Sequence, residues 1–147
     1  MSSEARGTAA FLLVSTGERR VGIPVEYLVA VAEVGETHPV PSPEPALRGV
    51  AQLRGRTMPV VHLGALLAGA ACPPEAASTG VIVRLGATQL CLEVDAADVV
   101  VREPVLALAS GAGMAWARGV VRRPDGLVPL LDFGALAARL TEIGVAT

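Results

Sequence analysis

Residues that could carry out chemistry are few in this sequence, and they do not form a recognisable set. The two histidines, His38 and His62, lie in different contexts, a proline-rich stretch and the end of an aliphatic stretch. No group of His, Cys and carboxylate residues has the spacing of a metal site, and no phosphate-binding loop or nucleophile motif occurs. The residue types therefore predict a protein that is not an enzyme and that uses no metal or other cofactor.

Arginines at expected turns are the polar residues most suited to recognition. Arg54 and Arg56 flank Gly55, and Arg122 and Arg123 precede a second expected turn. A guanidinium group held on a rigid turn can bind a carboxylate through two hydrogen bonds. The same residues are explained equally well as ordinary solubilising charges, so the residue types alone leave both interpretations open.

The composition predicts a soluble protein with an aliphatic core. The chain has 147 residues, of which 52% are hydrophobic and only 3% aromatic, and its formal net charge is −2. This size fits one domain or two small lobes that share a core. Nucleic acid is not an expected partner, because the sequence has no basic stripe. No apolar stretch reaches the ~20 residues of a spanning helix and the N-terminus lacks a signal-peptide pattern, so we expect a cytoplasmic protein without direct membrane insertion.

The two cysteines differ in their surroundings. Cys91 alternates into an apolar strand pattern and is expected to be a small core residue, whereas Cys72 lies in a loop rich in alanine and proline. A disulfide between them is possible, but a reducing compartment disfavours it.

The chain contains an internal repeat. The segment 48–68 matches the segment 118–138 without a gap, 70 positions further on, and shares its arginine, proline and glycine positions. A weaker match joins residues 17–25 to residues 86–94. A repeat of this length indicates two copies of one small module, and the seam between two modules is a place where a partner can bind.

Short strands separated by turn residues dominate the expected secondary structure. Long connections are expected at residues 35–45 and 103–113, the first because of its prolines. Helices are expected at residues 63–68 and from Asp132, as the N-cap, to about Ile143. About five strands in each copy are too few for an open sheet to shield its edges, so we expect small closed barrels. The expected strands are 9–15, 19–25, 46–53, 57–62, 80–85, 89–94, 97–102, 114–122 and 127–131, with a helical turn leading into a further strand within 26–34.

Residues 47–63, with the sequence LRGVAQLRGRTMPVVHL, resemble the signature of the CheW-like domain family. The most specific part is the Leu-Arg-Gly turn that is followed by a Pro-Val strand. Residues 22–25, 38–41 and 92–99 are similar to further elements of the family. The resemblance spans about residues 9–140, which is almost the whole chain.

The resemblance implies a mainly β fold. Two SH3-like five-stranded β-barrel lobes would pack on a shared hydrophobic core, with short helices and a C-terminal helix. Residues 9–147 would form a single domain of two interleaved lobes, the first barrel at about residues 20–80 and the second at about 81–140. Residues 1–8 are expected to be a disordered N-terminus.

The resemblance also implies a non-catalytic adaptor in a bacterial chemosensory array. Such a protein couples the cytoplasmic tips of methyl-accepting chemoreceptors to the regulatory domain of a CheA-type histidine kinase, and is recruited from the cytoplasm to membrane-associated receptor arrays. One lobe is expected to bind the kinase, and the seam between the lobes to receive the receptor. The residues implied for receptor binding are Leu28, Leu53, Arg54 and Gly55, and those implied for kinase binding are Gly49, Val94 and Val99.

Three positions depart from the family pattern. Gln52 replaces an asparagine, and His62 replaces an aspartate. A family glutamate falls on Ala30, or on Glu33 if a gap is allowed. These departures leave open a diverged protein of the same fold that binds only one of the two partners and acts as a spacer or regulator.

Overall fold

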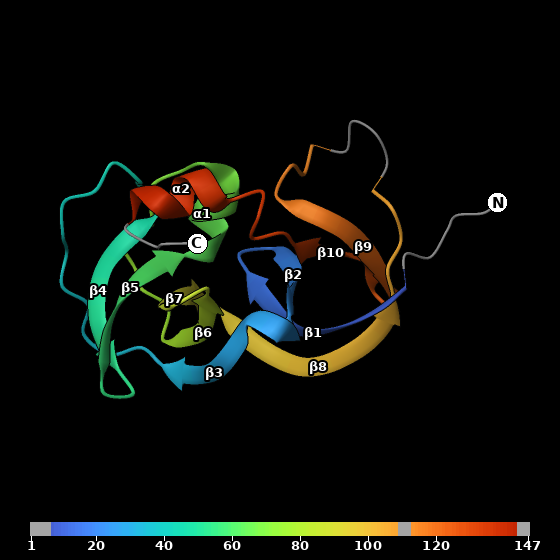
Figure 1. Cartoon of the computed structure of the whole chain (residues 1–147), viewed down its shortest axis with the longest axis horizontal. Helices are drawn as coiled ribbons and strands as arrows, with labels where there is room; N and C mark the ends of the chain where they lie inside the picture. Colours follow the sequence, from blue (N-terminus) through green and yellow to red (C-terminus); the bar gives the residue numbers. More distant parts are fainter. Residues whose placement is uncertain (1–6, 109–112, 144–147) are drawn as a thin grey trace.

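The computed structural model describes residues 7–108 and 113–143, which form two packed five-stranded sheets (Figure 1). This arrangement confirms the expected mainly β fold and is consistent with two SH3-like barrels. Of the segment 1–8, which was predicted to be disordered, residues 1–6 lie outside the described residues, and Thr8 already begins a strand. The strands are β1 (Thr8–Thr16), β2 (Arg19–Pro24), β3 (Leu28–Glu33), β4 (Leu47–Leu53), β5 (Arg56–His62), β6 (Thr79–Leu85), β7 (Thr88–Val94), β8 (Ala96–Pro104), β9 (Ala117–Arg123) and β10 (Gly126–Leu131), and the helical segments are η1 (Val25–Tyr27), α1 (Leu63–Ala68) and α2 (Ala137–Glu142).

The two copies of the repeat exchange hairpins. Sheet A has the strand order β8-β1-β2-β10-β9, and sheet B has the order β3-β6-β7-β5-β4. In chain order each strand of the second copy comes five strands after its counterpart, so β6 corresponds to β1 and β10 to β5. Sheet A combines the β1–β2 hairpin of the first copy with β8, β9 and β10 of the second. Sheet B combines the β6–β7 hairpin of the second copy with β3, β4 and β5 of the first. We call the parts built on these sheets lobe A and lobe B. The expected barrel boundaries at residues 20–80 and 81–140 are therefore wrong: sheet B is built from the continuous stretch 28–94, whereas sheet A joins residues 8–24 to residues 96–131.

Equivalent strand edges explain why the boundaries were wrong. The parallel pairs Val60↔Cys91 and Leu130↔Gly22 join each hairpin to strands of the other copy. Both copies carry the same apolar pattern, so either hairpin offers a matching edge. Sequence similarity between the copies cannot distinguish pairing within a copy from pairing between copies.

The helices differ from expectation only at the C-terminal end. Helix α1 has the predicted bounds, but α2 begins five residues after Asp132. The Asp132 carboxylate accepts a 3.2 Å hydrogen bond from a backbone amide in a preceding turn and does not cap α2. That turn directs Phe133 and Leu136 into the shared core, which delays the start of the helix. None of the described helices is long and apolar enough to span a bilayer.

One hydrophobic core lies between the lobes, and each lobe also has a smaller core of its own. Along β1, Leu12 and Val14 belong to the shared core, whereas Phe11 and Leu13 belong to the interior of lobe A. Burial of both faces explains why residues 9–14 of this strand are all apolar. Strands of both lobes and both α-helices contribute to the shared core, as expected.

Helix α2 is attached to lobe B through a buried carboxylate. Arg139 donates hydrogen bonds to the two carboxylate oxygens of Glu44, at 2.9 and 3.1 Å, and also to the carbonyl oxygen of Leu66. Burial alone would raise the pKa of Glu44, but the hydrogen bonds from Arg139 and the Ala46 amide outweigh it and hold this pKa below its ordinary value. The chain that leaves lobe A through β10 is thus fastened to lobe B.

We expect Cys91 to resist thiol reagents that modify Cys72. Cys91 is fully buried in lobe B, and burial, together with the nearby charge of Glu93, raises its pKa to about 12. The thiolate is the reactive form, so little of it exists at neutral pH. Cys72 is partly exposed, and both cysteines are free. A chromogenic disulfide reagent should modify one thiol in the folded protein and the second only in urea; rapid modification of both without urea would contradict this expectation.

Candidate partner-binding surfaces

The turn between β4 and β5 projects Arg54 from a rigid base. Leu53 and Arg56 pair across the hairpin, which leaves Arg54 and Gly55 as a two-residue turn with φ angles of 54° and 78°. Two positive φ angles are typical of a type I′ turn, whose twist matches that of the strands. Among the described residues Arg54 alone combines a side chain with a positive φ, which is sterically costly. Arg54 and Gly55 are exposed, while Leu53 is buried beneath the turn.

Strand β3 exposes valines that sequence reasoning missed. Its residues alternate between half-buried and exposed, with Leu28 and Ala30 on the inner face. Leu28 is half-buried and packs against the shared core. Val29 and Val31 are 38% and 48% exposed. The period-two pattern of this strand was the signal that could have found them.

Strand β8 is the repeat counterpart of β3 and also exposes two valines. Val99 and Val100 are 51% and 54% exposed although they are consecutive. The pairing between β8 and β1 shifts register between Leu12 and Val14, and such an irregularity disturbs the alternation of faces. Both β3 and β8 are edge strands and run along the lower side of the molecule in Figure 1. We call these four valines, Val29, Val31, Val99 and Val100, the valine edges.

Gly49 has a structural reason to be glycine. Its φ is +152°, and a Cβ atom on it would lie 2.2 Å from the carbonyl oxygen of His38. The connection before β4 crosses the strand here, where His38 and Val50 exchange two backbone hydrogen bonds of 2.8 and 2.9 Å. The same approach recurs in the second copy, where a Cβ on Gly119 would lie 2.9 Å from the carbonyl oxygen of Leu106. Gly49 is buried and offers no side-chain surface to a partner.

The three residues predicted to bind the kinase do not lie on one surface. Val94 is fully buried in the shared core, and Gly49 lies under the crossing connection. Val99 is exposed on β8. In the free protein Val99 is therefore the only one of the three that offers an exposed side chain to a partner.

His62 performs the role that an aspartate has in the second copy. Its Nδ1 atom accepts a 3.0 Å hydrogen bond from the Ala65 amide at the start of α1. At the equivalent place, Asp132 Oδ1 accepts a 3.2 Å hydrogen bond from the Ala135 amide. Both arrangements satisfy a free backbone donor. The departure from the family pattern at His62 thus keeps the local backbone hydrogen bond, and the histidine is half-buried.

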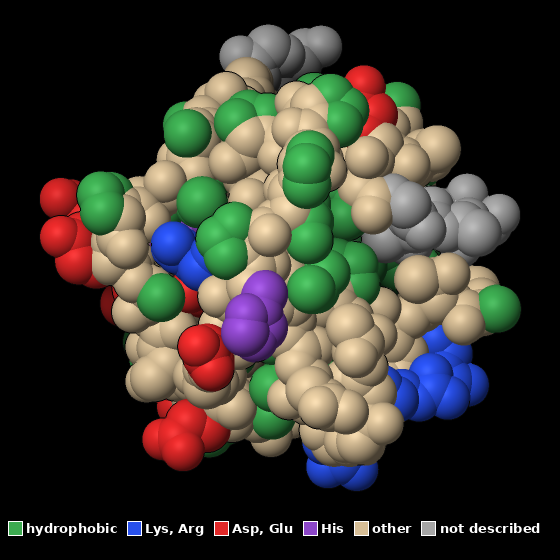
Figure 2. All heavy atoms as spheres, turned by 90° about the vertical axis from the view of Figure 1, so that its left-hand side faces the viewer, with side chains coloured by type: hydrophobic (Ala, Val, Ile, Leu, Met, Phe, Trp, Pro, Cys, Tyr) green, Lys and Arg blue, Asp and Glu red, His purple; other side chains and the backbone are tan. Residues whose placement is uncertain are grey.

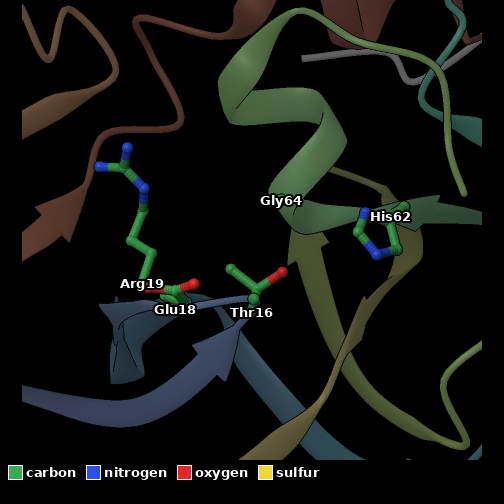
Figure 3. A pocket seen from close by; sticks show the side chains of 6 residues that line it. Thr16, Glu18, Arg19, His62 and Gly64 are labelled. Atoms are coloured by element: carbon green, nitrogen blue, oxygen red, sulfur yellow. The ribbon is translucent and has the colours of Figure 1, made fainter.

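The seam between the lobes contains a polar hollow (Figure 3). It measures about 570 Å³ and lies between the β1–β2 turn and the start of α1. Thr16 lies between His62 on one side and Glu18 with Arg19 on the other, as Figure 3 shows. The Thr16 hydroxyl is buried and has no hydrogen-bond partner among the described residues. A Cβ at Gly64 would lie 2.6 Å from that hydroxyl, so glycine keeps the seam open at this point.

The repeat produces a second, apolar hollow at the equivalent place in the other copy. It measures about 290 Å³. Leu85 and Gly86, at the β6–β7 turn, correspond to Thr16 and Gly17, and Phe133 and Gly134, which follow β10, correspond to the first two residues of α1. Tyr27 packs edge-on against Phe133, with 4.9 Å between ring centroids. Within residues 7–108 and 113–143, no group of three or more His, Cys, Asp or Glu residues could hold a metal ion.

A match to the CheW-like domain family covers residues 10–141, and the chain belongs to this family. Its structure is similar to that of the scaffolding protein TtCheW from Thermoanaerobacter tengcongensis, with a TM-score of 0.71 over 86% of this chain and 90% of that one, at 18% sequence identity. At this identity the likeness establishes the fold alone. No curated protein matches the chain. The expected resemblance is confirmed, and the family implies a chemotaxis scaffold rather than an enzyme.

Proposed function

We propose that this protein is a non-catalytic adaptor that couples methyl-accepting chemoreceptors to a CheA-type histidine kinase. It would act in the cytoplasm and be recruited to membrane-associated receptor arrays. The observation that carries the proposal is the exposed Arg54 on its rigid turn, in a chain of the CheW-like family. An adaptor needs separate surfaces for two partners, and the Arg54 turn and the valine edges are different in chemistry.

The receptor contact is assigned to the Arg54–Gly55 turn. The guanidinium group is exposed and forms no ion pair with the described residues, so it is available to a carboxylate of a partner. Leu53 is buried beneath the turn and supports it through packing, whereas Leu28 packs against the shared core. The turn fixes the arginine backbone before binding, which lowers the entropy lost on association.

The kinase contact is assigned to the exposed edge of β8, where Val99 and Val100 lie. A free strand edge with apolar side chains can pair with, or pack against, a β-rich partner. The regulatory domain of the kinase is expected to have the same fold. Val94 is buried in the shared core at the end of β7, two residues before β8 begins, and would contribute by supporting the fold.

Arg54→Ala should weaken receptor binding about tenfold or more and leave kinase binding unchanged. The expected loss is that of a charge-assisted hydrogen bond at an interface. Calorimetric titration with a receptor-tip helical hairpin and, separately, with the kinase regulatory domain would measure both affinities. Arg122→Ala is the matched control, because it removes an exposed arginine next to the equivalent turn of lobe A. Equal loss in both variants, or loss of the kinase arm alone, would count against the assignment.

A protein that binds only one of these partners is the second candidate. It is favoured by the burial of two of the three residues predicted to bind the kinase, Gly49 and Val94. The same titrations distinguish the candidates. Binding of both partners by the unsubstituted protein supports the adaptor, whereas binding of one alone supports a spacer or regulator.

A further inference from the structure

Lobe B has an opening between its two central strands. The parallel ladder between β5 and β7 begins at Val60↔Cys91, and the strands are separate before that pair. Pro59 has no N–H group and so cannot extend the ladder. The separated segments, residues 56–59 and 87–89, line a hollow of about 390 Å³. We call this hollow the β5–β7 cleft. Its walls are two strand edges without a neighbour on the side that faces the cleft.

Positive charge surrounds the β5–β7 cleft. Arg56 lines one wall and is exposed. Arg84 is exposed and directly opposite Gln89 of the other wall in the β6–β7 register, so their side chains share a face. Neither arginine has an ion-pair partner in the part of the chain that the structure describes, and the residues that line the cleft include no acidic side chain. In Figure 2, most basic side chains lie at the lower right and the bottom of the face shown, and most acidic ones lie at its left.

Lobe A shows how the equivalent opening is closed. There the parallel pairing between β10 and β2 is limited to Leu130↔Gly22. Arg20 of β2 forms an ion pair with Asp125 of the β9–β10 turn and lies 3.8 Å from Asp98. The carboxylate of Asp125 thus links the β9–β10 turn to β2 at a place that the β10–β2 ladder does not reach.

Lobe B lacks a carboxylate at the corresponding positions. The repeat places Gly55 where lobe A has Asp125, and Gln89 where lobe A has Arg20. Lobe B does have a cationic side chain at this opening, that of Arg56, but it lies on β5, the wall opposite Gln89. No carboxylate of the described residues links the two walls of the β5–β7 cleft, so this place is open to a carboxylate of another molecule.

We propose that the β5–β7 cleft binds an extended acidic segment of a partner protein. A carboxylate of that segment pairs with Arg56, and a second can reach Arg84 beside the opposite wall. The segment's backbone lies along the free strand edges, as in binding by strand addition. Arginine suits this role because its fork binds a carboxylate with two hydrogen bonds. The contact goes beyond the proposed function, since it requires neither Arg54 nor the valine edges.

A blocked octapeptide of alternating threonine and glutamate tests the proposal, with a peptide of threonine and glutamine as its control. We expect the glutamate peptide to bind at low ionic strength, to shift the backbone amide signals of Thr57 and Thr88 in NMR spectra, and to dissociate in ~1 M salt. Arg56→Ala should weaken binding about tenfold. Arg122→Ala, on lobe A, should leave it unchanged.

A second variant places a carboxylate of the protein itself in the β5–β7 cleft. Gln89→Glu places an acidic side chain on the wall opposite Arg56, as an internal substitute for the ligand. We expect this variant to stay folded and to lose the glutamate peptide. The proposal is overturned if the glutamine peptide binds as tightly, if neither peptide binds, if Gln89→Glu or Arg56→Ala retains full affinity, or if Arg122→Ala loses as much as Arg56→Ala.

Discussion

Glu93→Ala is expected to lower the free energy of unfolding by about 3–5 kcal/mol. The Glu93 side chain in β7 is fully buried, and its two oxygens accept hydrogen bonds of 2.9 and 3.0 Å from Nε of Arg48. One of these oxygens also accepts a 3.0 Å hydrogen bond from the Ala77 amide. Alanine would leave the Arg48 side chain, which is only 13% exposed, without its counter-charge, and the Ala77 amide without an acceptor.

Arg48 extends the effect of this substitution to the loop before β6. Its remaining nitrogens donate to the carbonyl oxygens of Pro73 and Glu75, at 2.9 and 3.3 Å. The ion pair therefore fastens residues 69–78 to β4 and β7. We expect hydrogen exchange of this loop to quicken in Glu93→Ala before the sheet is affected.

The repeat provides a matched control for the Arg48–Glu93 pair. Arg118 occupies the position of Arg48 in lobe A, and its contact with Glu26 is 3.8 Å long and exposed. Arg118→Ala should cost less than about 1 kcal/mol in urea unfolding followed by circular dichroism. A cost below about 1 kcal/mol for Glu93→Ala as well would show that water solvates the Arg48 guanidinium and that the pair is not important for stability.

The sequence predicted the positions of strands well, because local signals set them. Glycine, proline and charged residues separate short aliphatic stretches in the sequence. The bounds of β5 and α1 were therefore predicted to within a residue. The hairpin exchange could not be predicted, since both copies carry the same pattern. Burial of Glu93 was also hidden, because its partner Arg48 is 45 residues away and charged residues are rarely buried without one.

The sequence predicted the turn that holds Arg54 and Gly55, but not which side chains of β3 are exposed. Arg54 and Gly55 lie in the expected turn and are exposed. Leu28 was placed by an ungapped comparison, and a shift of one residue along a strand exchanges its faces. The exposed valines of this strand are Val29, which follows Leu28, and Val31. The β5–β7 cleft depends on where a parallel ladder ends, which has no signature in the sequence.

Gly49→Ala is expected to reduce the free energy of unfolding by about 2–5 kcal/mol, from a strained backbone angle and from overpacking together. The added methyl group would meet the backbone of His38, with the carbonyl oxygen at 2.2 Å and the carbonyl carbon at 2.7 Å. Backbone atoms cannot move aside as a flexible side chain can, so the crossing connection itself must shift. Its two hydrogen bonds with Val50 would be lost with that shift.

Gly69→Ala separates the two causes. Gly69 has a φ of +68°, and nothing lies within 4 Å of a Cβ placed on it. Its substitution adds strain without a collision and should cost about 1 kcal/mol. Thermal unfolding of both variants measures the difference, and equal losses would show that the connection yields to the methyl group.

The same Gly49 variant decides how this position affects partner binding. If its role is structural, Gly49→Ala weakens receptor and kinase binding together, and only as far as the folded fraction falls. Titrations at a low temperature, where the variant is still folded, should then give nearly normal affinities for both partners. A folded Gly49→Ala protein that binds the receptor normally but no longer binds the kinase would instead show that the kinase contacts the backbone at this crossing. Burial of Gly49 in the free protein would then not keep it from the interface.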